Sequence, residues 1–192
     1  KNGIMLEGAT DPAQPGSTDL LVEGVEALNP FPRVRPDYPG YVDHPQRLTM
    51  QDVRFDRYDV GLDVTAAAHV LLEDVILTRH STQAIRAMGH QAFWTVRRAI
   101  IDSNAGAGLG FNDPTSSIQH LSIESSTWTD PLIVADPGNH PTTVGTLVLR
   151  NNIGLLGAYT ISDCAGAQCG QLLDPQDRVE IDYNIWYYPL DT

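Results

Sequence analysis

Four ionisable side chains in the middle of the chain recur at nearly regular intervals. They are Asp63, Arg86, Asp113 and Asp136, and the steps between them are 23, 27 and 23 residues. Three carboxylates brought together would supply the hard oxygen ligands that Ca²⁺ takes. An arginine among them would pair with a carboxylate or hold an anionic group. Such chemistry requires a fold that returns the chain to the same place about every two dozen residues.

A repeated sequence segment, which we call a phrase, predicts such a fold. Seven segments share one pattern of apolar positions, namely 20–27, 48–55, 70–77, 94–101, 121–128, 147–154 and 179–186. Within each segment two apolar positions stand two residues apart, as on one face of a strand, and a step of three residues leads to the next apolar pair. We therefore predict that each phrase forms two short strands joined by a bend. The anchors of successive phrases lie 22 to 32 residues apart, which is typical of a solenoid.

A further strand is predicted ahead of most of these phrases. Its candidates are 3–6, 61–64, 84–87, 108–111, 132–135 and 159–162, and we call the sheet that they form the first-strand face. Three strands per turn predict an all-β fold, a right-handed parallel β-helix solenoid of about seven turns. Residues 1–192 would form this single domain, with turns stacked about 4.8 Å apart over roughly 34 Å.

The sequence resembles the right-handed parallel β-helix superfamily, which includes pectate lyase-like proteins. The resemblance covers most of the chain and rests on the phrase from Val148 to Ile153, the glycine-led first strands and the closing DYNIWYY of 182–188. In that superfamily an asparagine often occupies the bend between the second and third strands, where its amide can stack in a ladder.

Asparagines in the last phrases suit this bend. They are Asn151, Asn152 and Asn184, and asparagine and aspartate accept the unusual backbone angles that such bends need. Earlier phrases carry other residues near the same place, namely Asp52, Asp74 and Ser125. We therefore expect an incomplete ladder.

The resemblance also implies where a site would lie. Superfamily enzymes usually place their sites on the first-strand face, which implies a carbohydrate polymer as ligand and, for an enzyme, a polysaccharide lyase or a glycoside hydrolase. Arg86 would be the base or a clamp on a uronate carboxylate, and Asp113 with Asp136 would be the carboxylate pair that hydrolysis needs. The implied substrate-binding residues are Asp63, His90, Asn112 and Tyr38, and the implied calcium ligands are Asp63, Asp113 and Asp136.

Simpler interpretations stay open for these residues. Asp63 and Arg86 would form a surface ion pair of little energetic value, and His69, His90, His120 and His140 would be solvated turn residues. The short motifs of polygalacturonase-like hydrolases and alginate epimerases are missing from the sequence. The Lys–Arg pair of chondroitinase-like lyases is also missing, because Lys1 is the only lysine.

Two irregular stretches interrupt the repeat. Residues 29–47 are predicted to form a protruding loop, because four prolines in ten residues exclude regular structure. The loop would either hold a sugar, with Tyr38 among its side chains, or cover apolar surface.

Cys164 and Cys169 are predicted to close a small disulfide ring in an oxidising, extracellular or cell-surface location. A metal pair and two free thiols stay open as alternatives.

The net charge of the chain and its open strand edges indicate which kinds of partner the protein could bind. The net charge of −12 disfavours nucleic acid and anionic membranes, and no apolar run reaches membrane-spanning length. The chain begins within a turn, and a bare strand edge there would favour end-to-end self-association or covalent continuation of a longer solenoid. A second hypothesis follows from that edge: a structural or adhesive solenoid, or a filament subunit, without catalysis.

Overall fold

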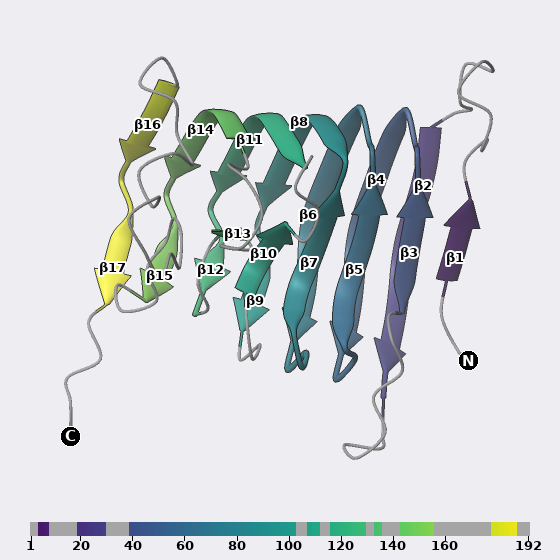
Figure 1. Cartoon of the computed structure of the whole chain (residues 1–192). Coiled ribbons are helices and arrows are strands. Elements are labelled where there is room, and N and C mark those ends of the chain that lie inside the picture. The colour runs from purple at the N-terminus through teal and green to yellow at the C-terminus, as the bar shows by residue number, and fades with distance from the viewer. Residues whose placement is uncertain are drawn as a thin grey trace.

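The computed structural model describes residues 4–7, 19–29, 39–102, 107–111, 116–129, 133–135, 143–155 and 178–187. In this part of the chain all regular elements are β-strands. Figure 1 shows them side by side in one stack, with β1 near one end and β17 at the other. Among the described residues there is no helix that could cross a membrane.

The first-strand face is a parallel sheet of short strands in the order β1-β3-β5-β7-β10-β13. Their bounds are Ile4–Glu7 for β1, Gly40–Asp43 for β3, Val60–Thr65 for β5, Gln83–Met88 for β7, Ala107–Phe111 for β10 and Ile133–Ala135 for β13. Each strand pairs in parallel with the strand of the next turn. The predicted strands near 3–6, 61–64, 84–87, 108–111 and 132–135 are therefore confirmed, and 159–162 lies outside the described residues.

The seven phrases form the second and third walls of the coil. In the first three phrases each phrase is one bent strand: β2 (Asp19–Leu28), β4 (Arg47–Asp56) and β6 (His69–Thr78). Later phrases divide into two strands at the bend: β8 (His90–Arg97) and β9 (Ile100–Asp102), β11 (Ser117–Glu124) and β12 (Thr127–Trp128), β14 (Thr143–Arg150) and β15 (Ile153–Leu155), β16 (Arg178–Asp182) and β17 (Ile185–Tyr187). We call the parts before the bend the second face and the parts after it the third face.

One residue per turn makes the bend by adopting a left-handed backbone. These residues have φ between 50° and 64°, and they are Gly24, Asp52, Asp74, Arg98, Ser125, Asn151 and Tyr183. Glycine, asparagine and aspartate tolerate this conformation best, which agrees with the prediction for Asn151. Asn152 and Asn184 were also expected at the bend, but each follows the bend residue and has no positive φ. Arg98 and Tyr183 adopt it because their position in the stack requires it, although their residue types do not favour it.

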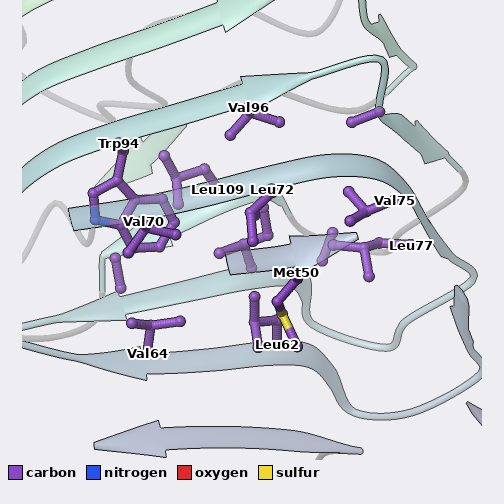
Figure 2. Close-up of a cluster of buried hydrophobic side chains, with 14 of the residues drawn as sticks. Met50, Leu62, Val64, Val70, Leu72, Val75, Leu77, Trp94, Val96 and Leu109 are labelled. Atoms are coloured by element: carbon purple, nitrogen blue, oxygen red, sulfur yellow. The ribbon is translucent and has the colours of Figure 1, made fainter. Parts of the chain in front are cut away.

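The inward positions of the phrases stack into columns that form the core. Leu72 pairs in register with Met50 on one side and Val96 on the other, and Val96 pairs with Ile123. All four are at most 1% exposed. Figure 2 shows Leu72 between Met50 and Val96, with Leu62 and Leu109 of the first-strand face nearby. The predicted interior row is confirmed, and so is the fold class, an all-β parallel solenoid.

The number of turns is not confirmed. The coil is described without a gap only over residues 39–102, which is fewer complete turns than the seven predicted. The right-handed sense of the coil stays a prediction.

The predicted loop over 29–47 is too long. Gly40–Asp43 forms β3, which pairs with β1 and β5. The strand was hidden because Val42 is its only large apolar inward residue and because it directly follows the proline-rich segment. Gly40 fits there because a Cβ would lie only 3.1 Å from the Phe55 ring and 3.2 Å from Leu62.

In the last turns, polar side chains replace the apolar ones at the inward position that follows the bend, and they form a ladder of hydrogen bonds. Asn152 Oδ1 accepts the Ser126 N–H at 2.9 Å, and Asn184 Oδ1 accepts the Asn152 N–H at 2.8 Å. The Asn152 amide also donates to the Ile123 carbonyl at 2.8 Å. Valines or alanine stand at this column in the earlier turns, so the ladder is incomplete, as predicted.

Candidate functional site

Asp63 and Arg86 lie side by side on the first-strand face. They are register partners on β5 and β7, and Arg86 Nε donates to Asp63 Oδ2 at 3.0 Å, with Nη2 donating to the same oxygen. Asp63 is 1% exposed and the Arg86 side chain is 24% exposed. The two residues therefore form an ion pair, as one interpretation of the sequence had it, but the pair is buried rather than on the surface.

This burial limits the chemistry that the pair can perform. The guanidinium of Arg86 already offsets the charge of Asp63, so a cation bound to Asp63 would lie beside a like charge. Asp113 and Asp136, the other expected calcium ligands, lie outside the described residues. In the part of the chain that is described, no group of three histidine, cysteine or acidic side chains could hold a metal ion.

His90 is the one further predicted site residue that the structure describes, and it lies away from this pair. His90 begins β8 on the second face, where its Nδ1 lies 2.9 Å from Ser117 Oγ. The remaining predicted residues lie outside the described residues, and they are Tyr38, Asn112, Cys164 and Cys169. Their roles and the disulfide stay predictions.

A row of rings on the second face was not predicted. His69, Phe93 and His120 occupy one register position on β6, β8 and β11. The rings of His69 and Phe93 are stacked with centroids 5.1 Å apart, and those of Phe93 and His120 are tilted with centroids 6.0 Å apart. Phe93 is 48% exposed. We call these three side chains the ring row.

The sequence contained a signal for the ring row. Each ring stands one residue before an inward apolar residue of the first column, namely Val70, Trp94 or Leu121. Side chains alternate along a strand, so all three rings must point outward at one height of the stack. His69 and His120 stand at the same place, three residues before Leu72 and Ile123, but His90 and His140 do not, so the four histidines taken together show no common position.

A hollow lies beside the ring row, on the side of the N-terminal turns. Arg47 pairs in register with His69 and with Asp19. Its Nε and Nη2 donate to the two Asp19 carboxylate oxygens at 2.6 and 2.7 Å, and both side chains are 64% exposed. The hollow has a volume of about 720 Å³ and is lined by Asp19, Gln46, Arg47 and His69.

These groups are suited to binding a ligand with hydroxyl groups. A carboxylate, an amide, a guanidinium and an imidazole together offer both donors and acceptors to hydroxyl groups, and the ring row adds apolar surface beside them. The hollow is open rather than enclosed, which suits an extended ligand. Glycoside hydrolysis needs two carboxyl groups that flank one bond, whereas Asp19 is the one carboxylate among the described residues that line the hollow.

The fold agrees with the resemblance to parallel β-helix proteins, because the described strands form a parallel β-solenoid. Membership of the pectate lyase-like superfamily stays a prediction. Comparison of the chain with protein families, curated proteins and solved structures finds no match in any of the three.

Proposed function

We propose that the protein binds a carbohydrate polymer on its second face, at the hollow lined by Asp19, Gln46, Arg47 and His69 and along the ring row. The observation that supports this is the continuity of the two features, since Arg47, His69, Phe93 and His120 share one row of the stack. A polymer that lies along the solenoid axis would meet one such side chain per turn. This position differs from the first-strand face expected from the sequence.

The energetic basis is a combination of hydrogen bonds and ring contacts. Hydrogen bonds to charged groups contribute about 1.5–3 kcal/mol each, and Arg47 and Asp19 supply such groups at an exposed place. Rings such as Phe93 provide apolar surface for the C–H faces of sugars. Because the hollow is open, it accommodates a segment within a longer chain as well as a chain end.

The setting of this function is part of the proposal. We place the protein outside the cell or on its surface, within the pectate lyase-like group, with a Cys164–Cys169 disulfide. Calcium would bridge this acidic protein to a polymer that carries carboxylates. Adding a chelator to the binding assay tests the calcium requirement without changing the chain.

The test is a binding screen with a panel of neutral and anionic polysaccharides, followed by affinity measurements on the best ligand. Arg47→Ala should weaken binding by about tenfold, because it removes one charged hydrogen-bond donor worth about 1.4 kcal/mol or more. Arg54→Ala is the matched control. Arg54 also donates across one turn, to Glu26 at 3.3 Å, but it lies on the third face. Arg54→Ala should bind as the unmodified chain does.

Two outcomes would contradict the proposal. One is that no polysaccharide in the panel binds to the unmodified protein. The other is that Arg54→Ala weakens binding as much as Arg47→Ala, which would show that the effect is not local to the hollow.

A further inference from the structure

The second face has an open strand edge at each end of the described stack. Among the described residues, β2 pairs only with β4, and β16 pairs only with β14. The two strands lie at opposite ends in Figure 1. All their pairings are parallel, so the free edge of β16 has the strand direction that the free edge of β2 needs from its next neighbour.

The core columns are less well covered at these edges than inside the stack. Ile181 belongs to the inward column and pairs with Leu149, yet Ile181 is 55% exposed while Leu149 is 2% exposed. At the other edge, the inward side chains of Leu20, Val25 and Ala27 are only partly buried, whereas Val22 is 6% exposed. An inward residue that is half exposed is what the last turn of a solenoid shows when no further turn covers it.

We propose that a second copy of this chain covers these edges by stacking head to tail, with β16 of one copy in parallel pairing with β2 of the next. Ile181 would then lie over Val22 of the next copy and continue the inward column. The bends also coincide in this register, because Tyr183 and Gly24 both have left-handed backbones, with φ of 52° and 64°. The contact joins two different surfaces, so it generates an open filament rather than a closed dimer.

One row of mostly charged side chains adds an electrostatic contribution to this contact. Its members are in register across the second face, and they are Glu23, Gln51, Glu73, Arg97, Glu124, Arg150 and Asp182. Inside the stack this row contains attractive pairs, such as Glu73 with Arg97 at 2.6 Å. Arg97, followed by Arg98 and Gln51, lowers the pKa of Glu73 to about 2, so this carboxylate is ionised at neutral pH.

At the junction between copies the same row would bring two carboxylates together, Asp182 and Glu23. Their repulsion opposes stacking at low ionic strength and is screened by salt. Glu23→Arg replaces the repulsion by attraction, as in the Glu73–Arg97 pair. The proposed register therefore predicts a single substitution that strengthens the association.

The experiment is sedimentation velocity over a concentration series at low and high salt, with circular dichroism to verify that each variant is folded. The unmodified chain should form larger species as concentration and salt increase. Glu23→Arg should lower the concentration needed for assembly by about tenfold and remove its salt requirement. Ile181→Asp should abolish assembly. Ile153→Asp, at a 40% exposed isoleucine on the third face, is the matched control and should assemble as the unmodified chain does.

Three results would overturn the proposal. The first is that both the unmodified chain and Glu23→Arg stay monomeric at every concentration and salt. The second is that assembly survives Ile181→Asp. The third is that Ile153→Asp abolishes it equally, which would place the contact on the side of the coil.

Discussion

Asp63→Ala is expected to destabilise the folded chain by about 3 kcal/mol, because it removes the carboxylate of a largely buried ion pair. Arg86 would keep a largely buried guanidinium, since its side chain is only 24% exposed. Urea denaturation at neutral pH measures the change in the free energy of unfolding. A purely catalytic Asp63 predicts the opposite pattern, in which activity is lost and stability is kept.

Asp19→Ala is the matched control for this prediction. Asp19 also accepts two hydrogen bonds from an arginine of the next turn, but that pair is 64% exposed on both sides. Exposed pairs contribute about 0–1 kcal/mol, so Asp19→Ala should change the unfolding free energy by less than about 1 kcal/mol. Equal losses for Asp63→Ala and Asp19→Ala would contradict the account of the buried pair.

Asn152→Ala is expected to cost about 3 kcal/mol of folding stability. The Asn152 amide accepts the Ser126 N–H and donates to the Ile123 carbonyl, and the residue is 3% exposed. The substitution leaves both backbone groups buried without these partners, and each orphaned group costs about 1–3 kcal/mol. Chemical denaturation of the purified variant gives the value.

The neighbouring Asn151→Gly serves as the control. Asn151 is exposed and has φ of 54°, a backbone that glycine adopts without strain. We expect its unfolding free energy to change by less than about 0.5 kcal/mol. If Asn152→Ala is as harmless as Asn151→Gly, the ladder has no role in holding the last turns together.

Much of the coil could be predicted because every turn has the same requirement for apolar side chains inside. Every turn must place an apolar side chain at the same height inside, so positions such as Leu72 and Val96 could be aligned without knowledge of the fold. The bend was predictable where asparagine or aspartate occupies it. It was not predictable at Arg98 or Tyr183, where the stacking of neighbouring turns decides the backbone. The strand β3 was missed because Val42 is its only large apolar inward residue and because the strand directly follows a proline-rich segment.

The candidate sites were predictable only in part. Asp63 and Arg86 were expected on neighbouring turns, since strand alternation points both to the same side. Their burial was not expected, because alternation gives the direction of a side chain but not what covers it. The ring row was predictable in principle from the residues just before Val70, Trp94 and Leu121. Its connection to a hollow was not, since the shape of a hollow depends on side-chain positions.

The most direct test of the stacked coil is disulfide formation between outward positions of adjacent turns. Leu71 and Thr95 are register partners on β6 and β8, so their Cα atoms should lie about 4.8 Å apart, within the range that a disulfide spans. The variant carries Leu71→Cys and Thr95→Cys, with Cys164 and Cys169 replaced by serine. Thr49→Cys with Thr95→Cys is the control, because these positions are two turns apart, roughly 10 Å.

Mild oxidation followed by peptide mass spectrometry gives the readout. The stacked coil predicts a disulfide between positions 71 and 95 in nearly all molecules and none between positions 49 and 95. Free thiols at both positions of the first variant, or equal cross-linking in the two variants, would contradict the stacking of successive turns.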